Sequence, residues 1–322
     1  MKRSALLQVF AAIVAMLPAL ACAQAFPVKP VRMIVAFPPG GGTDIVGRMI
    51  ATRLSAVFGQ QVVVENRPGA DGILGTDIVA KAAPDGHTWL LGTAGQLAIN
   101  QSLYAKVPFD IARDFAPVTH VVTVDMMLTT HPSLPVKSVS ALVALAKARP
   151  GELNYASTGT GGIPHLAMEL FNHTARTKIN HIPYKGGSPA LADLTGGHVP
   201  MMVQSMVQGL PIVRSGKLRA LALLSPKRAT LLPDVPAAVE TLPGCEATNW
   251  YGLLVPANTP AVVQKRINEE VVKLLRSAEL KDQLVAQGAD PVGSTPEQFA
   301  AFLKSETAKW VRVIKDANIR AE

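Results

Sequence analysis

Segments typical of buried strands alternate with helical patterns along most of this chain of 322 residues. Residues 31–37 form a mostly apolar run, and the apolar side chains of residues 45–57 fall on one face of a helix. Further strands are expected at residues 61–65, 88–92, 153–156, 179–183, 199–203 and 218–224. Strands separated by helices favour a largely parallel sheet that helices cover on both faces. The pattern therefore predicts an α/β fold.

Two extended stretches predict that the chain passes between two lobes. Residues 118–130 are apolar over a length that exceeds one short core strand, so we expect the chain to leave the first lobe near Val124. Residues 250–255 predict the return, and helical patterns fill the chain after Pro260. We therefore assign residues 24–124 and 250–322 to lobe 1, and residues 125–249 to lobe 2.

The amino-terminal segment has the pattern of a secretory signal peptide. Basic residues precede an uncharged apolar run at residues 5–20, and residues 21–23 supply small side chains at the spacing that signal peptidase reads. The run is shorter than the roughly 20 residues of a membrane-spanning helix, so we expect residues 1–23 to be removed on export. The alternative is a lipoprotein, because the residues before Cys22 are similar to a lipobox.

Composition indicates a chain that folds around a core and does not bind nucleic acid. With 48% hydrophobic and 17% charged residues, it can bury sizeable apolar cores. The formal net charge is +8, but the basic residues are scattered, and no basic cluster alternates with aromatic side chains as a nucleic-acid groove requires. Loss of the leader leaves Cys245 as the single cysteine, so no internal disulfide can form.

A glycine-rich segment joins the first expected strand to the helix that follows it. Residues 37–44 read Phe-Pro-Pro-Gly-Gly-Gly-Thr-Asp. The glycines let the backbone approach a bound group, and the free N–H groups at the helix start attract an anion. An ordinary strand-to-helix connection is the alternative at this point.

Two later segments repeat this arrangement in the second lobe. Residues 155–162 read Tyr-Ala-Ser-Thr-Gly-Thr-Gly-Gly, and their hydroxyls and glycine N–H groups can donate to a carboxylate. In residues 182–189, Tyr184 offers a hydroxyl and Lys185 a charge, although a solvent-facing lysine beside a tight turn is the alternative. Helix starts in two lobes would suit a small acid held between them.

Nucleotide and catalytic motifs are missing from these segments. The P-loop pattern does not occur, Gly40-x-Gly42 lacks the third glycine of the dinucleotide pattern, and neither G-x-S-x-G nor H-E-x-x-H is present. His165 either faces a ligand or packs in its helix, and the lone thiol of Cys245 is typical of an inert cysteine. We expect no catalytic residues, no metal site and no cofactor, which argues against an exported hydrolase using Ser157 or His165.

The ordered motifs resemble the tripartite tricarboxylate transporter receptor family, also called the Bug family. They span essentially the whole chain after the leader, at residues 31–44, 65–70, 83–86, 114–118, 154–157, 165–166, 183–186, 232–236 and 250–257. The resemblance implies a two-lobed periplasmic-binding-protein-like fold of the type II kind, with a ligand cleft between the lobes.

The resemblance also implies a function. A periplasmic, monomeric receptor would bind a small carboxylate by hinged closure and without bond chemistry. The ligand would be a di- or tricarboxylate, an acidic amino acid or an aromatic acid. The receptor would deliver it to the membrane permease subunits of a tripartite tricarboxylate-type transporter, or alternatively to a sensor kinase.

Ligand-binding residues are implied for both lobes. The first glycine segment supplies Phe37, Pro39, Gly40, Gly41, Thr43 and Asp44, and the second lobe supplies Ser157, Thr158, Gly159, Thr160, His165, Tyr184 and Lys185. The chain departs from the family pattern at residues 203–205, where it reads Val-Gln-Ser, and at residues 163–164. These departures leave the identity of the ligand open, including the part that Gln204 and Ser205 play.

Overall fold

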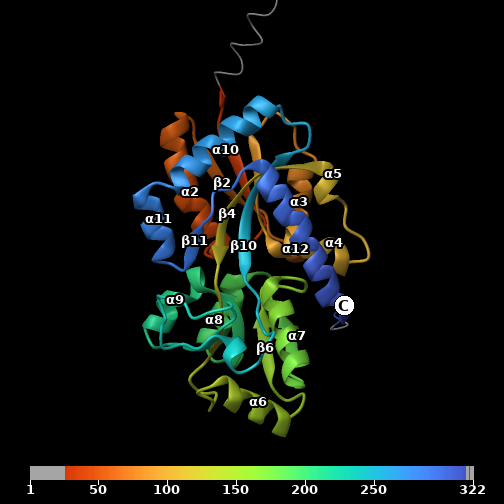
Figure 1. Cartoon of the computed structure of the whole chain (residues 1–322), viewed down its shortest axis with the longest axis vertical. Coiled ribbons are helices and arrows are strands. Elements are labelled where there is room, and N and C mark those ends of the chain that lie inside the picture. Colours follow the sequence, from red (N-terminus) through yellow and green to blue (C-terminus); the bar gives the residue numbers. More distant parts are fainter. Residues whose placement is uncertain (1–25, 317–318, 320–322) are drawn as a thin grey trace, which may run out of the picture.

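The computed structural model describes residues 26–316 and residue 319, and within this part the chain forms two α/β lobes, one above the other in Figure 1. The expected signal peptide and Cys22 lie outside the described residues. The predicted alternation of strands and helices is confirmed, and each lobe is built on one sheet.

Lobe 1 contains a six-stranded sheet with the order β11-β4-β10-β3-β1-β2. Its strands are β1 (Val31–Val35), β2 (Val62–Asn66), β3 (Thr88–Thr93), β4 (Phe115–Val124), β10 (Asn249–Pro256) and β11 (Ala289–Pro291). Its helices are α2 (Gly42–Phe58), α3 (Ile73–Ala80), α4 (Asn100–Leu103), α5 (Ile111–Asp114), α10 (Ala261–Leu275), α11 (Ala278–Val285) and α12 (Pro296–Asp316). A 3-10 turn, η1 (Ala70–Gly72), and a π-helical turn, η2 (Gly95–Ile99), complete it.

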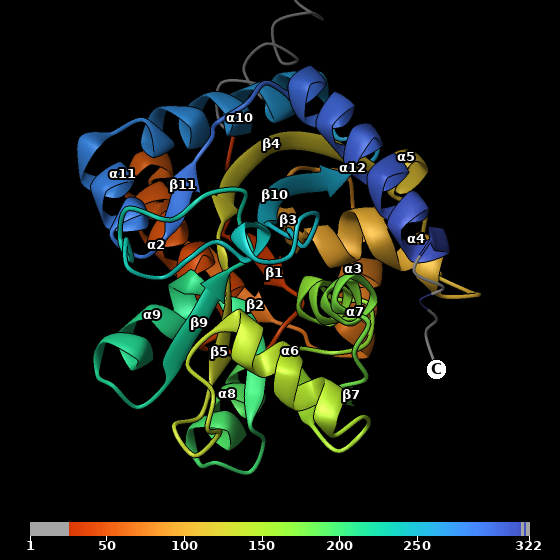
Figure 2. The same cartoon turned by 60° about the horizontal axis from the view of Figure 1, so that its bottom comes forward.

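Successive side chains of β1 point to opposite faces of this sheet, and each face has its own helices. Met33 joins a buried cluster with Leu54 of α2 and Ile267 of α10. Ile34 joins a different cluster with Phe299 and Trp310 of α12. Figure 2 shows α2 and α11 on one side of the central strands and α3 with α12 on the other. The mostly apolar run of β1 is thus explained by burial on both faces.

Lobe 2 contains a five-stranded sheet with the order β7-β6-β8-β5-β9. Its strands are β5 (Met126–Thr130), β6 (Asn154–Ser157), β7 (Asn180–Pro183), β8 (Met201–Ser205) and β9 (Arg219–Leu223). Its helices are α6 (Val139–Ala148), α7 (Ile163–Ala175), α8 (Gly187–Thr195), α9 (Met206–Arg214) and the 3-10 turn η3 (Ala238–Glu240). In β8, Val203 packs in the cluster that contains residues of α6 and α7, while Met202 packs with those of α8.

Both sheets are mixed, and most strands of each sheet run in one direction, so the expected α/β fold with largely parallel sheets is confirmed. β1 pairs in parallel with β2 and β3, and β6 pairs in parallel with β7 and β8. In contrast, β10 is antiparallel to β3 and β4, and β5 is antiparallel to β8 and β9. β5 and β10 enter their sheets directly from the crossings between the lobes rather than from a crossover helix, so they run opposite to the strands beside them.

The chain crosses between the sheets at two adjacent places. β4 ends at Val124 and β5 begins at Met126, so Asp125 is the crossing residue, and Asn249 at the start of β10 pairs with Val124. The long helix α12 secures the return strand, since Glu306 accepts hydrogen bonds from the indole N–H groups of Trp250 at 2.9 Å and Trp310 at 3.2 Å. The short elements η2, α4, α5 and β11 had no counterpart in the sequence pattern, because they contain only three to five residues each.

Candidate functional site

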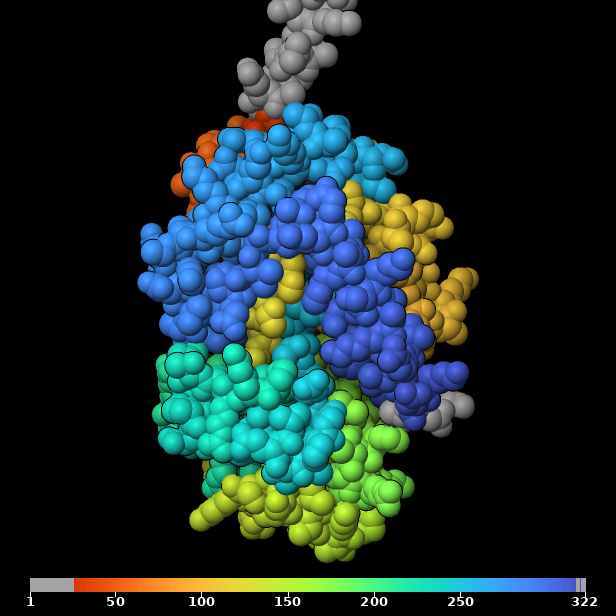
Figure 3. Space-filling model, viewed as in Figure 1, coloured from red at the N-terminus to blue at the C-terminus, as the bar shows by residue number. Residues whose placement is uncertain are grey.

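A small cavity lies between the lobes, where several strands end and helices begin. Its internal volume is about 50 Å³. The lobes are in contact around it, and in Figure 3 the green and cyan atoms of lobe 2 meet the blue atoms of lobe 1 across the front face. The lining residues are Phe37, Gly41, Gly42, Thr43, Thr93, Met126, Thr158, Gly162, Ile163, Pro164, Gly187, Ser205, Gln208, Asn249 and Tyr251.

Helix amino termini surround this cavity. In the described part of the chain, α2, α7, α8 and α9 begin at its wall after Gly41, Gly162, Gly186 and Ser205, and no side chain caps any of these four starts. The first N–H groups of a helix have no intrahelical partner, and the helix dipole makes them a positive end. One start comes from lobe 1 and three come from lobe 2. The Met206 N–H of α9 already donates to the Asp125 carbonyl, but the dipoles of all four helices favour a group with negative charge in the cavity.

Hydroxyl and amide groups complete the lining, and none of the lining side chains carries a charge. Tyr251 is buried, and it lines the cavity together with Thr43 of lobe 1 and Ser205 of lobe 2. Burial raises the pKa of Tyr251 to about 12, so the hydroxyl stays neutral and can donate. A Cβ atom at Gly42 would lie 2.5 Å from Ser205 Oγ and 2.7 Å from Tyr251 Oη, so this close approach requires glycine.

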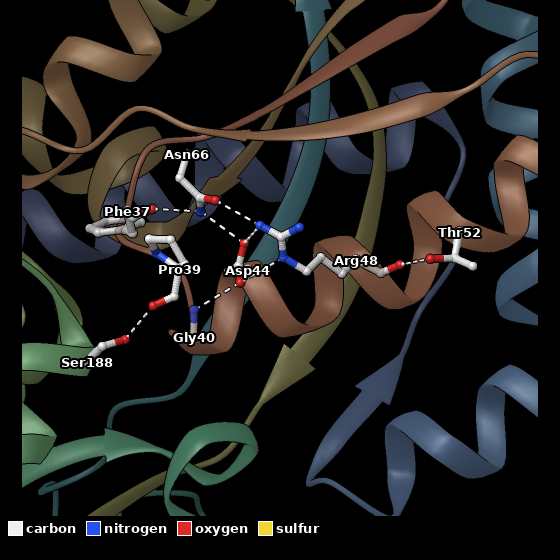
Figure 4. Close-up of polar contacts among 8 residues, drawn as sticks. All are labelled: Phe37, Pro39, Gly40, Asp44, Arg48, Thr52, Asn66 and Ser188. Atoms are coloured by element: carbon white, nitrogen blue, oxygen red, sulfur yellow. Dashed lines mark hydrogen bonds and ion pairs between the residues drawn. The ribbon is translucent and has the colours of Figure 1, made fainter.

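A hydrogen-bond network fixes the first glycine segment, as Figure 4 shows. The Asp44 carboxylate accepts from the Gly40 N–H at 2.9 Å, from Arg48 Nε at 3.0 Å and from Asn66 Nδ2 at 2.9 Å. Asn66 Nδ2 also donates to the Phe37 carbonyl at 3.0 Å. Burial would raise the pKa of Asp44, but the hydrogen bonds from Arg48, Gly40 and Asn66 outweigh it and hold this pKa below its ordinary value. Asp44 thus shapes the loop from behind the cavity wall.

The outer side of the same loop contacts the second lobe directly. Ser188 Oγ donates a hydrogen bond of 2.7 Å to the carbonyl of Pro39 (Figure 4). Pro39 and Gly40 line an open surface groove together with Ser188 and Leu191, rather than the enclosed cavity. These two predicted residues therefore lie at the lobe-to-lobe contact.

Ser157 stabilises the second glycine segment from inside the lobe. Its side chain is fully buried, donates to the Gly159 carbonyl at 2.9 Å and accepts from the Gly159 N–H at 3.1 Å. Ser157 Oγ is also 2.6 Å from Nε2 of His181. The sequence had not indicated this serine–histidine contact, because the two residues are 24 positions apart on separate strands.

Two stacked imidazoles lie behind this segment. The rings of His165 and His181 are 4.1 Å apart and nearly parallel, and the Gly161 N–H donates to His165 Nδ1 at 3.2 Å. Burial lowers the pKa of His181 to about 4, and burial together with His181 lowers that of His165 to about 3. Both rings are therefore neutral near pH 7, and His165 supports the loop from behind.

A second compartment adjoins the cavity and shares Phe37 and Thr158 with it. Its volume is about 620 Å³. The predicted residues Gly159, Thr160, Tyr184 and Lys185 line this compartment. The Tyr184 hydroxyl donates to Asp193 at 2.7 Å, and across the lobes the Tyr104 hydroxyl donates to the Thr160 carbonyl.

The structure thus places the predicted residues in four groups. Phe37, Gly41, Thr43 and Thr158 line the enclosed cavity. The remaining predicted residues line the adjoining compartment, lie at the lobe contact or support the loops from behind. Sequence reasoning missed Gly42, Thr93, Gln208, Asn249 and Tyr251. Gly42 could have been found, since it is the first residue of the helix whose start was singled out.

The described residues contain neither a candidate membrane span nor a candidate metal cluster. No helix among them is both long and apolar enough to cross a membrane. In the same part of the chain, no three His, Cys, Asp or Glu side chains are grouped so that they could hold a metal ion. Cys245 is buried, and burial raises the pKa of its thiol to about 12, as expected for an inert cysteine.

The two α/β lobes and the cavity enclosed between them define a two-lobed solute-binding protein. The family model described as "Tripartite tricarboxylate transporter family receptor" matches residues 46–319. The chain belongs to this receptor family, so the resemblance drawn from its motifs is confirmed. Receptors of this family are periplasmic solute-binding proteins.

Relatives and solved structures agree with this assignment. The chain is 40% identical over 300 residues to protein BugT of Bordetella pertussis, and the match covers 92% of each chain. It resembles the structure of R. palustris Rpa4515 with adipate at 35% identity and a TM-score of 0.90, covering 92% of this chain and 99% of that one. It also resembles the structure of MatC from Rhodopseudomonas palustris with bound malate at 31% identity and a TM-score of 0.86, covering 90% of this chain and 100% of that one.

Proposed function

We propose that this protein is a periplasmic receptor that binds a small carboxylate in the inter-lobe cavity and releases it to the permease subunits of a tripartite tricarboxylate-type transporter. The observation that carries the proposal is the convergence of four uncapped helix starts on one cavity. Adipate and malate in two related structures support a carboxylate as the ligand. Export would remove residues 1–23, and the receptor would act as a monomer.

The residues divide into those that would touch the ligand and those that would hold the loops. N–H groups at the start of α2, near Gly41 and Thr43, would bind a carboxylate from the lobe 1 side. Thr158 and the start of α7 would donate from lobe 2. Asp44, Ser157 and His165 would keep these loops in shape through the hydrogen bonds described above.

The size of the cavity favours a compact ligand. The cavity volume of about 50 Å³ is the space open to the centre of a water-sized sphere. One water molecule needs roughly 10–15 Å³ of such space, so the cavity corresponds to about four waters. Four waters fill ~120 Å³ of liquid, which suits a carboxylate of a few carbon atoms. A longer ligand would extend into the adjoining compartment beyond Phe37 and Thr158.

An enzymatic role has one observation in its favour and two against it. Ser157 and His181 are close enough for proton transfer, at 2.6 Å. However, Ser157 is fully buried, and no acidic side chain in residues 26–316 hydrogen-bonds to His181 as an orienting partner. The contact therefore supports a structural role.

Delivery to a sensor kinase would use the same cavity, and only the partner would differ.

A ligand screen tests the proposal. The mature protein is melted in the presence of dicarboxylates, tricarboxylates, acidic amino acids and aromatic acids, with neutral sugars as controls. A ligand at 100 times its Kd stabilises the folded state by about 2.7 kcal/mol, which raises the Tm measurably. Calorimetry then gives the Kd, and analysis of the mixture shows whether the ligand is recovered unchanged. If a neutral solute raises the Tm and no carboxylate does, the proposal is wrong.

A further inference from the structure

A buried carboxylate without a partner lies at the boundary of the two lobes. Asp71 belongs to η1 in lobe 1 and has a φ of +47°, a conformation that few residues other than glycine, asparagine and aspartate adopt. Both of its carboxylate oxygens are buried, and neither has a hydrogen-bond partner among the described residues. Leaving an ionised group in this state is costly unless it is protonated or meets a donor.

This carboxylate points across the cleft to the second glycine segment. A Cβ atom at Gly159 would lie 2.9 Å from Asp71 Oδ1, and one at Gly162 would lie 3.2 Å from the same oxygen. Gly162 lines the enclosed cavity, whereas Gly159 and Asp71 line the adjoining compartment. Asp71 therefore lies at the junction of the two spaces, against the loop for which the sequence predicted a ligand carboxylate.

The polar groups nearest to Asp71 are already engaged. Asn100 Nδ2 donates to the main-chain carbonyl of Asp71, at 3.1 Å, and not to its carboxylate. The Tyr104 hydroxyl donates to the Thr160 carbonyl. Lys185 lines the same compartment but forms no ion pair with Asp71. The donor that Asp71 needs must therefore come from what enters the cleft.

The charge of Asp71 also restricts what can bind beside it. Burial raises the pKa of Asp71 to about 7, so a large fraction of molecules carries the charge near neutral pH. A ligand carboxylate placed next to it would be repelled, since like charges at short range disfavour each other. An ammonium or hydroxyl group at the same place would supply the missing hydrogen bond.

On the basis of the proposed function, we infer that Asp71 selects carboxylates that bear a hydrogen-bond-donating substituent, an ammonium or a hydroxyl group, at the end facing the second glycine segment. The start of α2 holds the carboxylate, and Asp71 accepts from the substituent. Asp71 is thus a specificity-determining residue of this chain, and it makes the space beside Gly159 a site for a donor substituent, while Thr158 and the start of α7 remain donors to the carboxylate.

Matched ligands test this inference by calorimetry. Three sets differ only in the substituent: succinate, malate and aspartate; glutarate, 2-hydroxyglutarate and glutamate; adipate, 2-hydroxyadipate and 2-aminoadipate. One set will have the carbon chain length that the wild-type protein binds most tightly. Within that set, the wild-type protein should bind the hydroxy or amino acid at least 10-fold more tightly than the plain dicarboxylate. Preference for the amino acid over the hydroxy acid would identify an ammonium as the group that meets Asp71.

Variant Asp71→Asn removes the charge and keeps both the shape and the tolerance for positive φ. It should lose most of the preference for the donor-bearing ligand and should bind the plain dicarboxylate at least as tightly as the wild type. Asp77→Asn removes a neighbouring charge that pairs with Lys81 on the surface of α3, and it should change neither affinity.

The outcomes separate this inference from the proposed function. If the wild-type protein binds no carboxylate, the proposed function is wrong. If it binds carboxylates but prefers the plain dicarboxylate, or if Asp71→Asn leaves the ratio of affinities unchanged, the function stands and the role of Asp71 is refuted.

Discussion

Substitution of Gly42 by alanine tests whether closure of the lobes depends on close packing at the start of α2. The new Cβ atom would lie 2.5 Å from Ser205 Oγ of lobe 2 and 2.7 Å from Tyr251 Oη. A Cβ atom does not make non-bonded contacts this short, so the lobes must separate slightly or the two hydroxyls must move. Because Gly42 has helical geometry, alanine causes no backbone strain there.

The magnitude follows from the costs of overpacking and of helix formation. Inserting a methyl group into a well-packed region costs roughly 1–3 kcal/mol. This cost applies to the closed, ligand-binding form, so we expect the Kd to rise about 5- to 150-fold, since 1.4 kcal/mol corresponds to a factor of ten. Alanine is a better helix former than glycine by about 0.5–1 kcal/mol, so the unliganded Tm should not fall.

Calorimetry and small-angle scattering provide the measurements. Wild-type protein should become more compact when ligand is added, and Gly42→Ala should compact less at equal occupancy. Ser205→Ala removes one of the two clashing atoms, so the double variant Gly42→Ala/Ser205→Ala should bind more tightly than the two single effects predict when added. A Gly42→Ala protein with unchanged Kd and full compaction would refute the idea that this contact limits closure.

Two further predictions concern the support of the second glycine segment. The pKa of His165 is about 3 in the folded protein and 6.5 ordinarily, so the unfolded chain binds more protons below pH 6.5, and the free energy of unfolding decreases as the pH is lowered. For this residue the loss at pH 5 is about 2 kcal/mol, which urea unfolding can measure, and a His165→Gln variant should show a weaker pH dependence. Ser157→Ala leaves the Gly159 N–H and His181 without their partner, so the free energy of unfolding should fall by about 1–3 kcal/mol and the ligand should bind more weakly. A variant with wild-type stability and wild-type Kd would show that this hydroxyl does not stabilise the second glycine segment.

Local sequence patterns predicted most elements, because their signals are local. The run at residues 31–37 and the helix face from Ile45 follow from burial, and the strand-to-helix glycine segments mark the loops at the cleft. Ser205 resembles Gly41 in that it lies between a strand and a helix, directly before the first helical residue. Applying this rule to every strand end would have added the start of α9 to the site.

Features that join distant parts of the chain could not be predicted in this way. The apolar run of β10 is the same whether the strand is parallel or antiparallel, so the reversed direction of this strand could not be predicted. Tyr251 reaches the cavity only because β10 lies beside β3. The contact of Asp71 with Gly159 depends on how one lobe meets the other, and nothing in residues 66–72 alone indicates it.

The division of the helix starts between the lobes has a consequence for the transport cycle. Three starts belong to lobe 2 and one belongs to lobe 1, while no lysine or arginine lines the cavity. An incoming anionic solute would therefore be attracted mainly by the helix starts of lobe 2. The helix start of lobe 1 would contact the solute only when the lobes close. Separation of the lobes would break no ion pair between the solute and a cavity side chain of the described residues. Separation of the lobes would then also free the solute, because neither lobe alone surrounds it.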